Sequence, residues 1–129
     1  GGELSRFLLA MQGALADRGS APTLVFDEID TGVGGAVAEA IGKRLARLAD
    51  RVQVLSVTHA PQVAARAGSH LLIAKSLVSG AEERVATGVT PLGGADRREE
   101  IARMLAGSVI TNEARAAAEQ LMADERGRA

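Results

Sequence analysis

Three carboxylates follow directly on a short apolar stretch near the start of the chain. The residues 23–26, TLVF, are of the types that form a buried strand, and they are followed by Asp27, Glu28 and, after one isoleucine, Asp30. Burying a carboxylate is costly unless cations or hydrogen-bond donors compensate it. In parallel α/β sheets, ligands bind beyond the carboxyl ends of the strands. One carboxylate there could help to hold Mg²⁺, and the next could orient an attacking water as a general base.

These acids also have a plainer interpretation. They could form a solvated turn, or they could interact favourably with the dipole of the helix that follows. The acid pair alone does not separate a turn from a site, so further residues have to be considered.

A histidine follows the next apolar stretch in the same way. The residues 52–57, VQVLSV, are typical of a second buried strand, and His59 comes two residues after it. If the two strands are neighbours, the imidazole faces the same crevice as Asp27 and can donate a hydrogen bond to a phosphate. The plainer interpretation makes His59 a loop residue. His70, at the start of a later strand, has only that plainer interpretation.

Two glycines open the chain immediately before a helical pattern. Gly1 and Gly2 precede apolar residues spaced three or four apart from Glu3 onward, and backbone N–H groups at such a helix start favour an anion such as phosphate. The alternative is a cloning scar. Because no methionine stands first, we interpret the chain as a processed product, a tagged product or a fragment of something longer.

The hydrophobic periodicity predicts an α/β fold. Helices are expected at 3–18, 36–49, 97–105 and 112–123, with a short helix after Pro61, and Thr111 is expected to cap the last one. Strands are expected at 23–26 and 52–57, buried on both faces as in a parallel sheet, and at 70–75 and 83–92, which form an antiparallel hairpin. The result is a mostly parallel sheet flanked by helices, followed by the hairpin and two closing helices.

Composition narrows the class of protein. The chain has 129 residues, a net charge of −1, no cysteine and only two aromatic residues. Disulfides and thiolate metal sites are therefore excluded, and aromatic base stacking is not expected. No apolar run is long enough to span a membrane, so we expect one intracellular domain. Arg44, Arg47 and Arg51 could touch a nucleic acid backbone, but acids interleave with them, which favours a solvated helix face.

Four motifs in order carry a resemblance to a known family. The stretches GGELSR, TLVFDEID, TGVGG and VLSVTHAPQVA, with a closing REEIARMLAG, resemble in order and spacing the C-terminal half of the ATP-binding-cassette head in the RecN family of bacterial DNA repair proteins. These proteins are relatives of the structural maintenance of chromosomes (SMC) proteins. The resemblance runs essentially from end to end, and it implies that residues 1–129 form one partial head domain.

The resemblance implies roles for the candidate residues. Asp27 and Glu28 match the Walker B motif, in which Asp27 would hold Mg²⁺ through water and Glu28 would polarise the hydrolytic water. His59 matches the switch histidine that senses the γ-phosphate of ATP. The loop that begins at Asp30 matches the D-loop, but Gly34 stands where many relatives have an aspartate, so Asp30 receives no assigned role.

The remaining signature residues imply a dimer. Gly1, Gly2 and Glu3 match the end of the ABC signature motif, which in the family contacts ATP bound to the opposite head. The implied function is ATP hydrolysis at a head–head interface during recombinational repair of double-strand breaks. The implied partners are a second head and broken or double-stranded DNA, and the implied location is the bacterial cytoplasm, at the nucleoid.

One motif of the family is missing. No GxxxxGK[ST] phosphate loop occurs, because the only Gly-Lys pair, Gly42 and Lys43, follows Walker B and precedes Arg44. We therefore expect that the chain alone binds ATP weakly or not at all and does not hydrolyse it. An alternative is a non-catalytic module that packs against a chain supplying the Walker A half.

A third reading has a different chemistry. It is a metal-dependent hydrolase of another fold that uses Asp27, Glu28, Asp30 and His59. Tight divalent-ion binding without nucleotide would favour it, whereas the ATPase reading predicts weak ion binding unless ATP is present.

Overall fold

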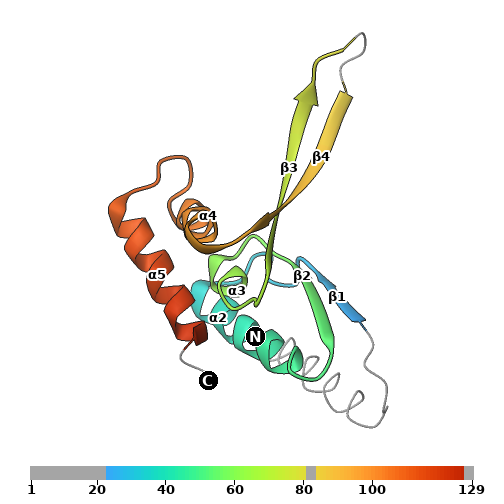
Figure 1. Ribbon diagram of the computed structural model, residues 1–129. Helices are drawn as coiled ribbons and strands as arrows, with labels where there is room; N and C mark the ends of the chain where they lie inside the picture. The colour runs from blue at the N-terminus through green and yellow to red at the C-terminus, as the bar shows by residue number, and fades with distance from the viewer. Residues whose placement is uncertain (1–22, 81–83, 127–129) are drawn as a thin grey trace.

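The computed structural model of the protein describes residues 23–80 and 84–126. Its elements in chain order are β1 (Thr23–Asp27), α2 (Gly35–Leu48), β2 (Gln53–Val57), α3 (Pro61–Ala64), β3 (His70–Val78), β4 (Arg84–Leu92), α4 (Gly94–Ala106) and α5 (Asn112–Arg126). The helix expected at 3–18, together with Gly1, Gly2 and Glu3, lies outside the described residues. Every other expected element is present, and the α/β class is confirmed (Figure 1).

The first unit is a parallel strand pair packed on a helix. β1 and β2 pair in register from Thr23 opposite Gln53 to Asp27 opposite Val57, and the intervening α2 packs against one face of the pair. Phe26 is buried in that core. The other members of the core come mainly from the apolar stripe of α2 and are Ala38, Ile41, Leu45, Leu48, Val52 and Val63.

The opposite face of this strand pair is open. Val25, Leu55 and Val57 are exposed, so the expectation that both faces are buried is wrong for this chain. The apolar composition of a strand indicates that it contributes to a core, but it does not say whether one face or both faces are covered.

Gly42 allows α2 and α3 to approach closely. A methyl group built at its Cα would lie 2.9 Å from the Gln62 carbonyl oxygen and 3.0 Å from Cγ of Arg66. Both distances are shorter than ordinary contacts, so only glycine fits without a shift. The short helix α3 therefore lies against the middle of α2. In this way its Val63 joins the core under β1.

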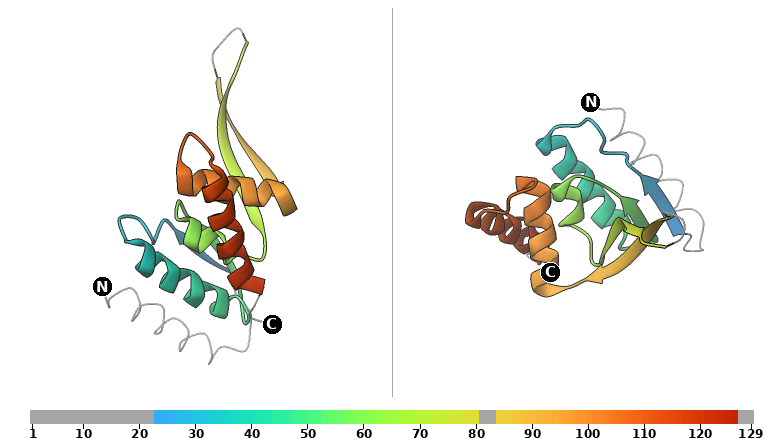
Figure 2. Two further views of the ribbon diagram at one scale, coloured as in Figure 1. Left: turned by 90° about the vertical axis from the view of Figure 1, so that its left-hand side faces the viewer. Right: turned by 90° about the horizontal axis from the view of Figure 1, so that it is seen from above.

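The second core lies between α4 and α5. Its buried members are Ala65, Ile101, Ala102, Ala114 and Ala118. Small residues at the contact let the two helices lie close together, as the side view in Figure 2 shows. Across the same contact, Arg115 of α5 forms an ion pair of 2.8 Å with Glu99 of α4, and that partner lowers the pKa of Glu99.

Side chains close the ends of two helices in this region. The Thr111 hydroxyl accepts a hydrogen bond of 3.1 Å from the Ala114 amide, so the predicted cap of α5 is confirmed. Arg97 of α4 donates to the carbonyl oxygens of Ala64, Ala65 and Ala67 at the end of α3. The periodicity of the sequence did not predict this link, because its partners are about 30 residues apart.

The hairpin forms a sheet of its own. β3 and β4 pair antiparallel from His70 opposite Leu92 to Val78 opposite Arg84, and both views show them projecting away from the helices (Figures 1 and 2). The hairpin is confirmed. The parallel pairing expected for the first two strands is found as well, but among the described residues this sheet has only two strands, and the hairpin is a separate sheet.

One face of the hairpin is apolar and exposed. Side chains alternate between the two faces of a strand, and the register places one set of large apolar residues on a single face. This hairpin apolar face consists of Leu71, Ile73, Leu77, Val85 and Val89. Within the described ranges, no helix is both long enough and apolar enough to cross a membrane.

Candidate functional site

The predicted site residues that the structure describes lie at or just after the carboxyl ends of the parallel strand pair. Asp27 ends β1 and lies opposite Val57, which ends β2. The segments that follow the two strands, 28–34 and 58–60, therefore leave the sheet side by side. The prediction that these strands are neighbours is confirmed, and His59 contacts Glu28, the residue after Asp27.

Glu28 occupies an unusual backbone conformation. Its φ is 53°, and among the described residues it is the one non-glycine position with a positive φ. This left-handed region is unfavourable for a residue with a side chain and persists only when the surroundings enforce it. Here the Glu28 amide donates to the Val57 carbonyl at 2.9 Å, and the Glu28 carbonyl accepts from the Thr31 amide at 3.2 Å. Both bonds hold the chain in a sharp turn directly after β1.

The turn brings Glu28 and His59 into contact. Oε1 of Glu28 lies 2.8 Å from Nε2 of His59. An ionised carboxylate can only accept, so Nε2 carries the proton of this hydrogen bond. The His59 side chain is 84% exposed and that of Glu28 is 49% exposed. The pair is therefore open to a ligand from solvent.

Asp30 points the other way and is buried. It is only 8% exposed, and its Oδ2 accepts hydrogen bonds from the Thr58 hydroxyl and, at 3.2 Å, from the Ala60 amide. The Ala60 amide also lies 2.9 Å from the Thr58 hydroxyl oxygen. These donors explain how a carboxylate is accommodated in a poorly hydrated position. The resemblance assigned Asp30 no definite role, and the sequence could not show these bonds because the partners lie 28 and 30 residues away.

Asp27 is exposed at the end of β1. A single accessible carboxylate beside an open crevice fits a Mg²⁺ ion that keeps most of its waters. In the described ranges, no three histidine or carboxylate side chains converge in an arrangement that could hold a metal directly. A hydrolase that binds a metal tightly through Asp27, Glu28, Asp30 and His59 together would need such a cluster, and Asp30 is directed into the protein instead.

An open groove runs beside the Glu28–His59 pair. It lies between the loop after β1, the start of α2 and the segment after β2, and it is lined by Asp30, Thr31, Gly32, Val33, Gly35, Ala38, His59, Ala60, Pro61 and Gln62. Gly34 precedes α2 without a side-chain cap, and the first turn of α2 has no acidic residue. At the start of α2 the groove is thus bordered by backbone amides that no side chain caps.

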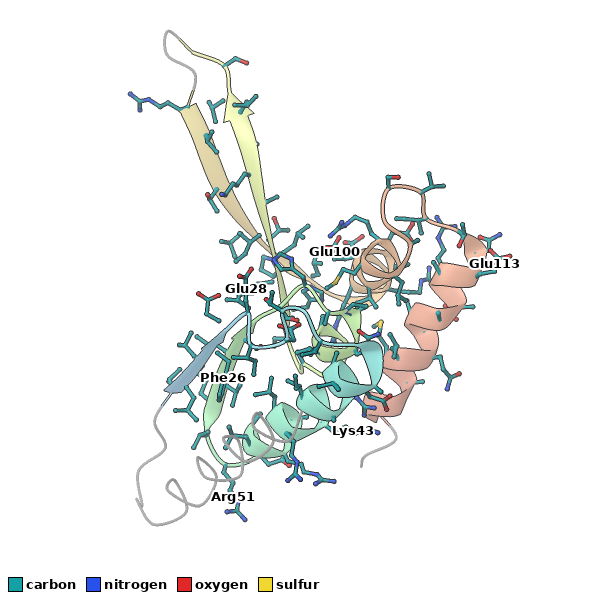
Figure 3. The ribbon with its side chains drawn as sticks, turned by 180° about the vertical axis from the view of Figure 1, so that it is seen from behind. Phe26, Glu28, Lys43, Arg51, Glu100 and Glu113 are labelled. Carbon is teal, nitrogen blue, oxygen red and sulfur yellow. The ribbon has the colours of Figure 1, made fainter. Side chains whose placement is uncertain are left out.

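The Gly-Lys pair and the arginines lie elsewhere. Gly42 and Lys43 are inside α2, where their amides are part of the helix, and Lys43 pairs with Glu39 at 2.7 Å. They do not form a phosphate loop. Arg51 precedes β2, so it lies at the end of the parallel unit opposite Glu28, as Figure 3 shows.

The chain is similar in sequence to a segment of known proteins. No protein-family model matches the chain. The "DNA repair protein RecN" of Streptomyces coelicolor is 50% identical over 122 residues, which is 95% of this chain and 21% of that protein. The RecN of Mycobacterium leprae is 49% identical over 122 residues, or 20% of its length, and that of Rickettsia felis is 44% identical over 122 residues, or 22% of its length. The chain spans about a fifth of the length of these curated relatives.

A solved structure has a similar fold. It comes from work described as "Structural biochemistry of ATP-driven dimerization and DNA stimulated activation of SMC ATPases", and it matches with a TM-score of 0.56 and 20% identity over 84% of this chain and 63% of that chain. Identity at this level supports the fold alone. The chain is therefore homologous to a segment of about 122 residues of RecN, to which it is 42–50% identical, and it has the fold of an SMC-type ATPase head.

Proposed function

We propose that the chain is the C-terminal half of an ABC-type ATPase head from a RecN-like protein. One observation carries this proposal: Glu28 and His59 contact each other at 2.8 Å beyond the ends of neighbouring parallel strands. A base and an imidazole at the carboxyl edge of a parallel sheet are suited to hydrolysing a phosphate ester or anhydride. The match to RecN makes ATP the proposed nucleotide.

Each site residue has a proposed task. Asp27, exposed at the strand end, would hold Mg²⁺ through water, and the ion would supply charge stabilisation for the phosphates. Glu28 would accept the proton of the attacking water. In the structure, His59 donates to Glu28 through Nε2, and it would donate to the terminal phosphate of bound ATP. His59 can exchange these acceptors because its side chain has little packing around it.

The proposed head needs a second half. Residues 1–129 form one partial domain, and the Walker A half would supply the lysine and backbone amides that grip the phosphates. Gly1, Gly2 and Glu3 would contact ATP bound to an opposite head, so hydrolysis would take place in a head–head dimer. The complete protein would act on broken or double-stranded DNA at the nucleoid in the bacterial cytoplasm.

The test compares the chain alone with a RecN-length protein that contains it. We expect no ATP turnover from the purified chain. In the longer protein, Glu28→Gln should lower kcat by at least about a hundredfold, because general-base catalysis contributes that much. Asp50→Asn is the matched control, since Asp50 is an exposed acid distant in sequence from the site. Turnover by the chain alone that Glu28→Gln abolishes would contradict the proposed half-site, and an active Glu28→Gln long protein would contradict the role of Glu28.

A second candidate is a non-catalytic module that packs against a chain carrying the Walker A half. The observation that favours it is the open apolar surface on both sheets, which includes Val25 and Leu55 on the parallel pair and Ile73 and Val89 on the hairpin. Surfaces of this kind on a small protein are usually interaction sites. Mixing the chain with the separately produced Walker A half should give a complex by size-exclusion chromatography. ATPase activity of that complex distinguishes the two candidates.

A further inference from the structure

The turn after β1 is hydrogen-bonded at several points to the end of β2 and to the segment that follows it. The Glu28 amide bonds the Val57 carbonyl, the Glu28 side chain bonds His59, and Asp30 bonds both Thr58 and Ala60. Two residues of one loop, Glu28 and Asp30, are therefore bonded to four consecutive residues of the other segment, 57–60. Of these contacts, those made by Asp30 are the buried ones.

We propose that Asp30 is a positioning residue for His59. Its carboxylate binds the residue before the histidine through a side chain and the residue after it through the backbone. The backbone of His59 is thereby fixed on both sides. This inference rests on the proposed function only in so far as His59 takes part in hydrolysis.

The exposure of His59 makes this backbone support necessary. With 84% of its side chain exposed, the imidazole has few packing contacts that could orient it. Its direction is set by where its Cα is held and by its hydrogen bond to Glu28. A catalytic group must be held close to its productive geometry by its surroundings. The hydrogen bonds of Asp30 to Thr58 and Ala60 provide this constraint for His59.

The chemistry of an aspartate suits the task. An ionised carboxylate is an acceptor only, and hydrogen bonds to a charged acceptor are stronger than those between neutral groups. Both groups that face Oδ2, a hydroxyl and an amide, can donate. Because Ala60 directly precedes Pro61, the first residue of α3, the same bonds also fix where that helix starts.

Hydrogen exchange on the chain itself tests the inference without ATP. In Asp30→Ala, exchange of the Ala60 amide measured by NMR should speed up about tenfold, which corresponds to the loss of one such hydrogen bond, and the imidazole signals of His59 should shift. Amides inside the β1–β2 pair, such as that of Val54, should keep their rates. Asp30→Asn retains an acceptor oxygen and should restore most of the protection. The control Asp50→Asn should change nothing at Ala60.

A second variant covers the case in which Asp30→Ala does not fold. Thr58→Val has the same shape without the hydroxyl, and it should shift the His59 signals in the same direction, whereas Thr58→Ser should not. Unchanged exchange at Ala60 and unchanged His59 signals in these variants would overturn the inference. An equal rise at Ala60 and Val54 would overturn it too, because it would reveal a general structural role.

Turnover separates this inference from the proposed function. In a RecN-length protein, Asp30→Ala should lower kcat about tenfold or more, as expected for a misplaced catalytic group, with little change in KM. Faster exchange without a loss of kcat would mean that the bonds exist but do not position a working histidine, which overturns the inference. Full activity of Glu28→Gln would instead reject the proposed function and leave the exchange result valid.

Discussion

The two sheets of this chain consist of similar apolar strands but are stabilised differently. β1 and β2 have five residues each and bury Phe26 against α2, so that one face of the pair is part of a core. β3 and β4 have nine residues each, yet Leu77 near the hairpin tip is 74% exposed. The longer strands thus bury a smaller fraction of their apolar side chains.

This difference in packing indicates which sheet can hold catalytic groups in fixed positions. Catalytic groups need a rigid support, and the parallel pair provides it because α2 and α3 pack beneath the strand ends. A two-stranded hairpin is marginally stable by itself in water. In agreement with this, the site residues in the described ranges lie at the end of the packed pair, and the hairpin carries a largely apolar exposed face.

The largest effect that would sharpen the comparison comes from truncating one large apolar side chain in each sheet. Phe26→Ala should lower the free energy of unfolding by about 3–5 kcal/mol, because it removes a buried aromatic ring and leaves a cavity. Ile73→Ala on the hairpin apolar face should cost less than about 1 kcal/mol. Urea unfolding followed by circular dichroism measures both. Equal losses would show that the hairpin is as well buried as the parallel pair.

A methyl group added to one glycine in each region gives the next largest contrast. Gly42→Ala places a methyl group 2.9 Å from the Gln62 carbonyl and should destabilise by about 1–3 kcal/mol, as for overpacking. At Gly88 in β4 the nearest atom, the Ala74 carbonyl oxygen, is 3.9 Å from the added carbon. Gly88→Ala should therefore be neutral or slightly stabilising. A harmless Gly42→Ala would contradict the close approach of α2 and α3.

As the pH falls, protonation of His70 at the start of β3 should lower the stability of the fold before the ion pairs of Glu99 and Glu100 are lost. Burial lowers the pKa of His70 below its ordinary 6.5, Arg97 lowers it further, and Glu100 opposes them. As the pH falls below 6.5, the unfolded chain takes up a proton that the folded chain resists, so stability decreases. Glu99 and Glu100 have a pKa below their ordinary 4.5, and the stability they provide is lost only in that lower range.

The measurement is urea unfolding at several pH values between about 7.5 and 5. The wild-type chain should lose stability across this interval, and His70→Gln should flatten the loss. A slope that is the same in His70→Gln would mean that another group is responsible.

The smallest effect is expected at the hairpin tip. Leu77→Thr replaces an exposed apolar side chain by a residue that favours strands, so the free energy of unfolding should change by no more than about 0.5 kcal/mol. The same substitution should weaken any complex that covers the hairpin apolar face. A large loss of stability in the isolated chain would show that this face is already packed.

Much of the fold could be predicted because its signals are local. Apolar spacing located the helices, Thr111 marked a helix start that the structure confirms, and the acids after TLVF and the histidine after VLSV marked two strand ends that do meet. The separation of the strands into two sheets could not be predicted in this way. Strand pairing depends on segments far apart in the chain, and hydrophobic periodicity does not record which segments meet.

The sequence by itself determined the order of the elements, the residues at the strand ends and the resemblance to RecN, because each depends on neighbours within a few positions. Only the tertiary structure decided that Glu28 would face His59, that Asp30 would turn inward to Thr58, and that Ile73 would remain exposed. The contacts of Glu28 and Asp30 join groups about 30 residues apart, and the exposure of Ile73 depends on whether any other element packs on the hairpin, so neither can be read from local sequence. The type of a residue limits which groups it can bind, and the tertiary structure decides which of those groups lie within contact distance.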